Sequence, residues 1–543
     1  MRSTMMDYPL TLVRFLERAG RYFPDTEIVS RMPDKSLHRE SYGDFYRRAR
    51  ALAAALTRAG LKKGDRVATL MWNHYAHLEA YFGVPVSAGV LHTLNLRLHP
   101  QEIAYIVNHA EDRFLIVDDI LLPLYEQFRS QVNFERVIVV RLTGNPTPDG
   151  FDDYEKFIAP GGDAFTYPTI DEKDPLGMCY TSGTTGKPLG VVYSHRSTVL
   201  HAMNVGLADA IGTPSGTTYL TLVPMFHVNA WGAPYINTAL GIKQVFPGPY
   251  YDAESILDLM EREQVGLAAG VPTLWMGVLQ ALEREPKRWR LLPGLTLVVG
   301  GSAAPEAMMR AFDRLGITLL HAWGMTETSP MGTVSRLKPK LEKLGEDQRY
   351  AIRVKQGLPA LLVELRVMAN DKEVPPDDQT MGEIEVRGPF ISGGYYKTAP
   401  SPEKFSPDGW LRTGDIAVVD AEGYVKIVDR SKDVIKSGGE WISSLDLENF
   451  LMGHPAVAEA AVIAVPHPKW DERPLAVVVL KPGQSATPEQ LAEFLRPKVP
   501  KWWLPDAYVF TDAIPRGSTG KFLKSRLRDL YGKGAPSAAG KAG

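Results

Sequence analysis

Two blocks of this sequence alternate between short apolar runs of strand length and longer runs with the helical spacing of apolar residues. The first block predicts, in turn, strand 67–71, helix 75–84, strand 89–92, helix 100–109 and strand 114–117. The second block follows a Pro- and Gly-rich surface connection at 143–169 and runs from a strand at 219–223 to a helix at 305–315. Parallel β–α–β units build sheets with helices on both faces. We therefore predict an α/β fold with a large N-terminal body of doubly wound sheets.

The pattern changes after residue 330. Short alternating strands up to residue 428 predict a small β-rich lobe attached to the body, and a mixed pattern from 445 to 510 predicts a compact α+β unit. Between them, residues 429–436 hold five charged side chains in eight positions, which favours a solvated segment over a core one. We predict an N-terminal domain at 1–429, a hinge at 430–436, a mobile C-terminal lid at 437–531 and a disordered tail at 532–543.

Length, charge and cysteine usage narrow the remaining alternatives. A chain of 543 residues is too long for one compact core, and its net charge of −2 lacks the basic footprint of a protein that binds nucleic acid. The single cysteine, Cys179, excludes an internal disulfide and a cysteine-rich zinc site. We predict a cytoplasmic protein in which Cys179 is buried at the end of a strand.

No stretch of the sequence predicts a membrane span. Residues 1–20 mix charged and apolar side chains, so they lack the apolar core of a signal peptide. Their spacing is typical of an amphipathic helix, which offers a surface for a homodimer. The longest stretch without Asp, Glu, Lys or Arg, at 210–242, is interrupted by Gly, Pro, Asn and His and does not fit a transmembrane helix.

Residues 180–196 read Tyr-Thr-Ser-Gly-Thr-Thr-Gly-Lys-Pro-Leu-Gly-Val-Val-Tyr-Ser-His-Arg. Glycines let the backbone expose its N–H groups, and the hydroxyls and Lys187 add donors, which favours a phosphate-binding loop over an exposed Gly/Ser/Thr linker. A Walker P-loop is excluded, since Thr181 stands where that motif needs glycine and Pro188 where it needs Ser or Thr. The predicted phosphate contacts in this loop are Thr181, Ser182, Gly183, Thr184, Thr185 and Gly186.

This stretch resembles the phosphate loop of the adenylate-forming superfamily, which includes acyl-CoA synthetases, luciferases and the adenylation domains of peptide synthetases. The family pattern is Tyr-Thr-Ser-Gly-Thr-Thr-Gly-x-Pro-Lys-Gly-Val. Here Leu189 stands at the family's lysine, and whether Lys187, two positions earlier, reaches the same phosphates is left open. Six motifs in the family's order extend the resemblance over nearly the whole chain. The segments 226–231 and 438–455 look like the bacterial fatty-acyl-CoA synthetase branch.

The resemblance implies a site for nucleotide and acyl group in the middle of the chain. A lone histidine in a loop is often structural, but similarity to the family's aromatic–histidine motif makes His227 a catalytic residue and places Val228 and Trp231 around the acyl group and nucleotide. This motif holds no aspartate, which disfavours an amino-acid substrate. The turn at 300–305 and the segment 321–327 add, by the same resemblance, Gly301, Ser302, Ala303, Ala322, Trp323, Gly324, Met325 and Thr326.

Trp323 replaces the family's tyrosine and keeps an aromatic face that can stack on adenine. A Thr-Glu pair is often only a helix cap, but the resemblance makes Glu327 a catalytic residue that holds Mg²⁺ together with Thr181 beside the ATP phosphates. By the same resemblance, Lys521 in the terminal Gly-rich turn would be the catalytic lysine that bridges the carboxylate and the α-phosphate. The resemblance also assigns nucleotide contacts to Asp415, Arg430, Lys432, Lys436 and Trp441, and coenzyme A contacts to Gly438 and Gly439.

The implied activity is that of an ATP-dependent fatty-acid–CoA ligase. A carboxylate and MgATP would form acyl-AMP and pyrophosphate, and coenzyme A would then take the acyl group as a thioester and release AMP. The lid would rotate between the two half-reactions. The open alternatives are an adenylating ligase for aryl or other acids, one with a different acyl acceptor, and a luciferase-like oxidase. A non-catalytic nucleotide sensor is disfavoured because Lys521 is present.

Overall fold

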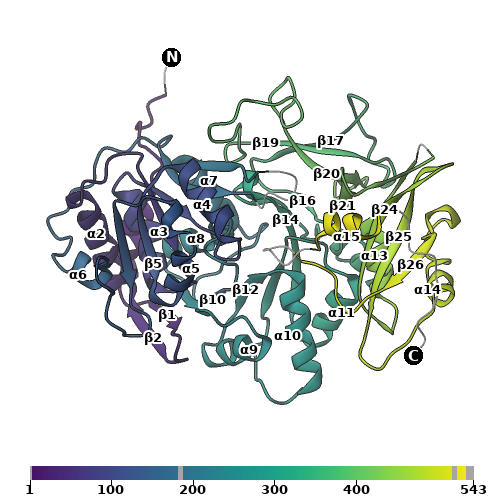
Figure 1. Ribbon diagram of the computed structural model, residues 1–543, viewed down its shortest axis with the longest axis horizontal. Helices are drawn as coiled ribbons and strands as arrows, with labels where there is room; N and C mark the ends of the chain where they lie inside the picture. Colours follow the sequence, from purple (N-terminus) through teal and green to yellow (C-terminus); the bar gives the residue numbers. More distant parts are fainter. Residues whose placement is uncertain (1–2, 182–186, 439, 517–521, 533–543) are drawn as a thin grey trace.

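The computed structural model describes residues 3–181, 187–438, 440–516 and 522–532. Two large, mainly parallel sheets form the N-terminal body, an antiparallel five-stranded sheet lies above them, and a separate sheet carries the C-terminal part at the right of Figure 1. The predicted α/β class, with a β-rich lobe and a C-terminal α+β unit, is confirmed. The domain boundaries and the mobility of the last unit stay predictions.

The first predicted block forms a seven-stranded sheet in the order β7–β6–β5–β3–β4–β8–β9. Its pairs are parallel except for β8 and β9, which are antiparallel. Helices α3 (Tyr75–Val86) and α4 (Pro100–Ala110) connect the central strands. Since β8 and β9 flank the predicted phosphate loop, that loop lies at one end of an edge pair. The strands are β3 (Arg66–Leu70), β4 (Val90–Thr93), β5 (Asp112–Asp118), β6 (Arg136–Val140), β7 (Asp152–Asp153), β8 (Pro175–Tyr180) and β9 (Gly190–Ser194).

The second block forms a nine-stranded sheet in the order β16–β15–β14–β13–β12–β10–β11–β1–β2. Its central strands are parallel, and β14 turns back into β15 as an antiparallel pair. The N-terminal strand β1 joins this sheet beside β11, which the local pattern does not predict. The strands are β1 (Glu27–Arg31), β2 (Leu37–Ser41), β10 (Thr218–Thr221), β11 (Lys243–Phe246), β12 (Leu267–Gly270), β13 (Thr296–Val299), β14 (Thr318–Gly324), β15 (Met331–Val334) and β16 (Leu358–Pro359).

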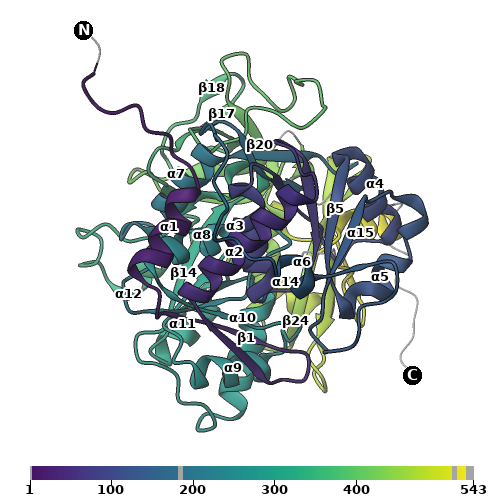
Figure 2. The ribbon, with the colours of Figure 1, turned by 90° about the vertical axis from the view of Figure 1, so that its left-hand side faces the viewer.

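Helices cover the two sheets and the space between them, as Figure 2 shows for α1, α2, α3 and α8. Helix α1 begins at Val13 and buries its apolar side against α2 and α8, which confirms the predicted amphipathic helix. Among the described residues, no helix is long and apolar enough to span a membrane. The remaining body helices are α1 (Val13–Tyr22), α2 (Tyr42–Arg58), α5 (Leu122–Glu126), α6 (Tyr154–Ile158), α7 (His195–Gly206), α8 (Ala233–Leu240), α9 (Ala253–Arg262), α10 (Pro272–Arg284), α11 (Glu306–Arg314) and α12 (Glu346–Arg353).

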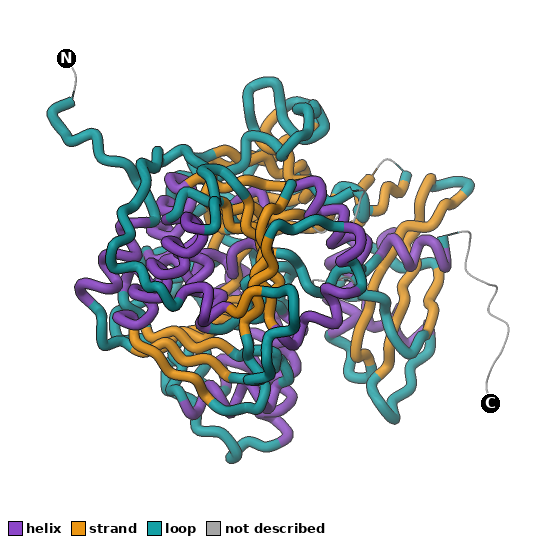
Figure 3. Tube along the Cα trace, turned by 60° about the vertical axis from the view of Figure 1, so that its left-hand side comes forward, coloured by secondary structure: helices purple, strands orange, loops and turns teal. Residues whose placement is uncertain are grey.

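The lobe and the C-terminal unit each build a sheet of their own, and Figure 3 shows the C-terminal strands set apart from the body. The lobe strands are β17 (Glu364–Ala369), β18 (Lys372–Glu373), β19 (Gly382–Arg387), β20 (Leu411–Val419) and β21 (Val425–Arg430). The C-terminal elements are β22 (Ile435–Ser437), β23 (Glu440–Ile442), α13 (Ser444–Met452), β24 (Val457–His467), β25 (Asp471–Leu480), α14 (Pro488–Leu495), β26 (Ala507–Phe510) and α15 (Lys524–Tyr531).

The connection at 143–169 lies mostly at the surface, as predicted. It also contains the short helix α6, which begins where the Asp153 side chain accepts from Lys156 N, and which buries Tyr154 and Ile158. One local prediction is wrong. The charged segment 429–436 is not uniformly solvated, because Asp429 and Asp433 are buried. Each buried carboxylate has a partner close in space. Ser444 N donates to Asp429 Oδ2 at 2.7 Å, and Arg528 Nη1 pairs with Asp433 Oδ1 at 2.7 Å. Cys179 lies near the end of β8 and is buried, as predicted.

Candidate active site

The phosphate loop joins β8 to β9, and its two ends are held together by a short ladder. Thr181 N donates to Leu189 O at 2.9 Å, and Leu189 N donates to Thr181 Oγ1 at 3.1 Å. Residues 182–186 lie outside the described residues. The Lys187 ammonium lies 5.3 Å from the centre of the Tyr105 ring, which is a cation–π contact at the surface. Leu189 therefore pairs with Thr181 at the base of the loop, while the Lys187 ammonium contacts an aromatic ring on α4.

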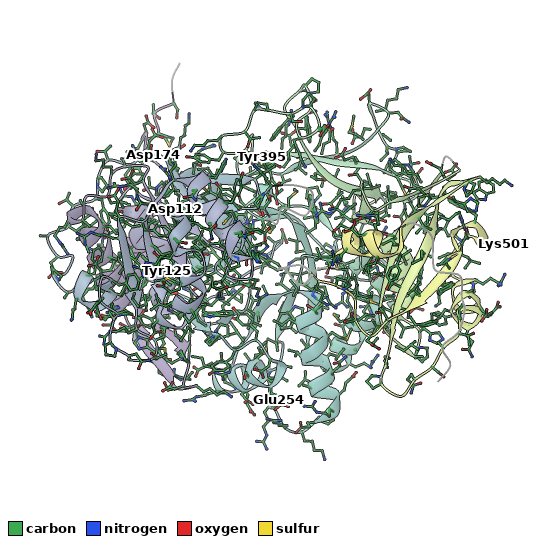
Figure 4. All side chains as sticks on the ribbon, in the orientation of Figure 1. Asp112, Tyr125, Asp174, Glu254, Tyr395 and Lys501 are labelled. Carbon is green, nitrogen blue, oxygen red and sulfur yellow. The ribbon has the colours of Figure 1, made fainter. Side chains whose placement is uncertain are left out.

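The Thr-Glu motif follows β14 and is tied to the same edge pair. Tyr193 on β9 donates its hydroxyl to Thr326 O at 2.8 Å. The Glu327 side chain is buried, and Tyr395 Oη donates to its Oε1 at 2.7 Å; Tyr395, labelled in Figure 4, belongs to the connection between β19 and β20. Burial and the neighbouring Glu327 charge raise the pKa of the Tyr395 hydroxyl well above its ordinary value, so it remains a donor. Hydrogen bonds from Tyr193 and from Tyr395 thus hold the Thr-Glu motif in place.

Trp323, Asp415 and Arg430 come together although they are far apart in the sequence. Trp323 Nε1 donates to Asp415 Oδ2 at 2.9 Å, and Arg430 Nε lies 2.8 Å from Asp415 Oδ1. The Asp415 carboxylate is almost completely buried. Each of its oxygens keeps a further lone pair for another donor. The structure thereby joins three predicted nucleotide residues from β14, β20 and β21 through one carboxylate.

The end of β14 is packed so closely that only glycine fits at position 324. A Cβ atom there would overlap the Pro330 carbonyl oxygen, which accepts a hydrogen bond from Met325 N at 3.1 Å. The facing Gly332 leaves room for the Trp323 ring. This close approach fixes the turn that carries Met325, Thr326 and Glu327.

We expect Gly324→Ala to lower the free energy of unfolding by about 3 kcal/mol or more, because a backbone oxygen cannot move away as a side chain can. Urea denaturation checks the stability, and the KM for ATP reports the displaced motif. Gly277→Ala, inside α10 where the nearest atom is 3.8 Å away, should be neutral or stabilising. Wild-type stability and KM in Gly324→Ala would show that the turn can relax.

The segment 228–232 follows His227 and takes left-handed backbone angles at every residue, with φ of 38° at Val228, 53° at Asn229, 46° at Ala230, 56° at Trp231 and 77° at Gly232. Such angles are costly for a β-branched residue such as Val228, and strain of this kind concentrates at ligand sites. The packed surroundings must hold the segment in place.

Several buried groups hold this left-handed segment. The Asn73 side chain donates to Thr221 O and Val223 O at 2.8 and 2.9 Å and accepts from Met225 N at 2.7 Å, which fixes the chain before it. A Cβ atom at Gly232 would lie 2.8 Å from the His201 ring. Burial lowers the pKa of His201 to about 3, so this ring is neutral.

The left-handed segment also brings two predicted pocket elements together. A Cβ atom at Gly300 would lie 3.0 Å from the Trp231 ring, so Trp231 lies directly against the turn that contains Gly301, Ser302 and Ala303. His227 is partly buried at the start of the segment, and its N–H donates to Pro224 O at 3.0 Å. Trp231 and the turn at 300–303 are therefore neighbours, and their role in a pocket stays a prediction.

The predicted residues that follow the lobe make no contact with Glu327 or Asp415 that the described part of the structure shows. Lys432 and Lys436 are exposed, and the Trp441 ring packs on Ile416, Val418 and Val428 of the lobe. Gly438 takes a φ of 63° and donates its N–H to Trp470 O at 2.8 Å. Gly439 and Lys521 lie outside the described residues, so their predicted roles are not tested.

Sequence reasoning missed the residues that support this site. Tyr193 and Tyr395 contact the predicted residues Thr326 and Glu327. Asn73 and His201 hold the chain before and at the end of the left-handed segment. His201 accepts a hydrogen bond from Met331, 130 positions away, and Tyr193 donates one to Thr326, 133 positions away. No local sequence pattern links residues so far apart. The Gly-Gly-Tyr-Tyr run at 393–396 was the available signal for Tyr395.

The comparisons with known proteins agree with the motifs. A family model described as AMP-binding enzyme matches residues 16–396, and one described as AMP-binding enzyme C-terminal domain matches residues 446–521. The chain therefore belongs to the AMP-binding enzyme family, the adenylate-forming superfamily predicted above.

The chain is also similar to individual members of that family. It is 50% identical to a long-chain-fatty-acid–CoA ligase of Thermus thermophilus over 97% of each chain. It is 42% identical to a 3-methylmercaptopropionyl-CoA ligase of Ruegeria lacuscaerulensis, over 98% of this chain and 99% of that protein. Its structure matches that of the anthranilate CoA ligase AuaEII in complex with anthranoyl-AMP with a TM-score of 0.86 at 25% identity, over 98% of this chain and 99% of the other.

Proposed function

We propose that this chain is an ATP-dependent fatty-acid–CoA ligase. A fatty acid and MgATP react to acyl-AMP and pyrophosphate, and the thiol of coenzyme A then displaces AMP to give the thioester. The observation that carries the proposal is the 50% identity, over 97% of both chains, to a long-chain-fatty-acid–CoA ligase. The single buried cysteine supports a cytoplasmic location for this chemistry.

Each group of residues in the candidate active site has its own role in the two half-reactions. The carboxylate oxygen attacks the α-phosphorus while the phosphate loop and Lys521 balance the charge that builds up there. Asp415 accepts from the ribose hydroxyls, and Trp323 offers a face to adenine. His227 and Trp231 line the acyl side. For the second half-reaction, residues beyond Lys432 rotate and bring Gly438 and Gly439 to coenzyme A.

The candidate active site also fits a magnesium ion. Among the described residues no three His, Cys, Asp or Glu side chains come together as a metal cluster, so Mg²⁺ would take most of its oxygens from ATP and water. Glu327, a buried carboxylate, and the Thr181 hydroxyl are the protein oxygens that would hold it. Mg²⁺ supplies charge neutralisation at the phosphates.

The choice of acid is tested directly by measuring CoA-thioester formation with fatty acids of increasing chain length, 3-methylmercaptopropionate and anthranilate. We expect the highest kcat/KM with a medium- or long-chain fatty acid, because the segments around Trp231 and Gly300 carry no charged side chain. If kcat/KM for either of the other two acids exceeded that for every fatty acid by more than about tenfold, equivalent to ~1.4 kcal/mol, the proposed substrate class would change to that acid.

The displaced loop lysine gives a second test. We expect Leu189→Lys to lower the KM for ATP about fivefold, because an added ammonium near the phosphates contributes ~1 kcal/mol. Lys187→Ala should change this KM less than about twofold, since the Lys187 ammonium contacts Tyr105. The opposite pattern, a large loss in Lys187→Ala and no gain in Leu189→Lys, would show that Lys187 already binds phosphate.

A further inference from the structure

The connection between β19 and β20 contains a segment, residues 392–397, that contacts both the Thr-Glu motif and the start of β9. At one end Ser392 N donates to Glu327 O at 2.7 Å, and three positions later Tyr395 Oη donates to Glu327 Oε1 at 2.7 Å. At the other end Tyr396 N donates to Gly190 O at 2.8 Å. Gly190 is the first residue of β9, directly after the phosphate loop.

Tyr395 is held firmly where it meets Glu327. Its ring packs against the buried cluster of Cys179, Val191 and Tyr193, which belongs to the β8–β9 pair. A phenol ring packed on two strands has little freedom to rotate, so its hydroxyl points in a fixed direction. Among the described residues, Tyr395 is the side chain that donates to the Glu327 carboxylate. The hydrogen bond therefore fixes one carboxylate oxygen and leaves the other to accept or coordinate.

Lys397, two positions after Tyr395, anchors the far end of segment 392–397. Its ammonium pairs with Glu111 Oε1 at 2.7 Å and lies 3.3 Å from His109 O, at the end of α4. The His109 ring in turn contacts the hydroxyl of Tyr180, the last residue of β8, at 2.7 Å through Nδ1. Segment 392–397 therefore bridges the Thr-Glu motif, both strands that flank the phosphate loop, and α4.

We propose that Tyr395 is a positioning residue for Glu327 and that segment 392–397 holds this carboxylate in place relative to β8 and β9. The proposal rests on the proposed function, in which Glu327 binds the metal that accompanies ATP. Partners that hold a metal-binding carboxylate by hydrogen bonds typically change metal affinity by about 10- to 100-fold when they are removed. Tyr395 itself touches neither metal nor substrate.

The test measures metal binding rather than turnover. Mn²⁺ replaces Mg²⁺, and the signal of free Mn²⁺ in electron paramagnetic resonance gives its affinity for the full-length protein in the presence of ATP. We expect Tyr395→Phe to weaken Mn²⁺ binding about tenfold, and the pyrophosphate-release rate to recover at high metal concentration. Tyr396→Phe is the matched control, because the Tyr396 ring contacts His109 instead, and it should bind Mn²⁺ like the wild type.

Glu327→Gln and the double variant separate the possible results. If Tyr395 acts through Glu327, its substitution should have little further effect on Mn²⁺ affinity in the Glu327→Gln background. Wild-type Mn²⁺ affinity in Tyr395→Phe, with weakened binding in Glu327→Gln, would overturn the role of Tyr395 and leave the metal assignment standing. Wild-type Mn²⁺ affinity in Glu327→Gln would overturn the metal assignment itself. Urea denaturation of each variant distinguishes a loss of folding from a loss of metal affinity.

Discussion

Replacing Lys521 by alanine is expected to slow pyrophosphate release about 100- to 1000-fold, which is the usual cost of removing one donor that stabilises charge in a transition state. Thioester formation from added acyl-adenylate and coenzyme A should fall less than about tenfold, because the lysine acts only while the α-phosphorus is attacked. Pyrophosphate release and thioester formation are measured separately, with the acyl-adenylate supplied chemically in the second assay.

The matched control is Lys501→Ala, an exposed lysine of the same C-terminal unit, labelled at the right edge of Figure 4. It removes one positive charge from that unit without touching the terminal Gly-rich turn, and both half-reactions should keep their wild-type rates. Lys521 lies outside the described residues, so this assignment rests on the motif alone. Equal pyrophosphate release by Lys521→Ala and the wild type would show that the motif has been misassigned.

Replacing Asp415 by alanine is expected to have the second largest effect. The KM for ATP should rise at least about 30-fold, because the ribose loses a charged acceptor worth ~2 kcal/mol. The free energy of unfolding should also fall by about 1 to 3 kcal/mol, because Trp323 Nε1, now 2.9 Å from Asp415 Oδ2, would be left buried without an acceptor. ATP titration and urea denaturation measure the two effects independently.

Trp323→Phe separates the two roles of Asp415. It removes the indole donor but keeps an aromatic face, so the KM for ATP should rise only a few-fold while Asp415 still pairs with Arg430. The ribose contact would be wrong if Trp323→Phe raised the KM as much as Asp415→Ala. In that case the carboxylate would act on the nucleotide only by holding the indole.

The regular parts of the body could be predicted because the central strands contain short apolar runs. Parallel strands covered on both faces, such as β5, give continuous apolar runs, and the amphipathic helices between them give the complementary period. The helix predicted at 100–109, for example, is α4, which ends one residue later. The sequence positions of the motifs, from the phosphate loop to Asp415, also follow directly from their residue types.

The contacts that join those motifs could not be predicted from the sequence. The hydrogen bond from Trp323 to Asp415 spans 92 positions, and a Trp in place of Tyr gave no indication that its N–H would be used. The charge run at 429–436 was misleading for a related reason. Asp433 is buried because Arg528, almost a hundred residues later, returns to pair with it. A run of charged residues is therefore solvated only where no residue distant in sequence pairs with its charges.

The placement of β1 has a consequence for how the chain folds during synthesis. β1 lies between β2 and β11 in the nine-stranded sheet, and Val29 is in register with Val245. The hairpin of β1 and β2 therefore leaves the ribosome more than two hundred residues before its second neighbour, with an unpaired apolar edge. Contacts so distant in sequence form slowly. The open edge of β1 must therefore wait until residues 243–246 have been made, and the sheet is complete only after β14, which carries Trp323, and β15 and β16 have followed.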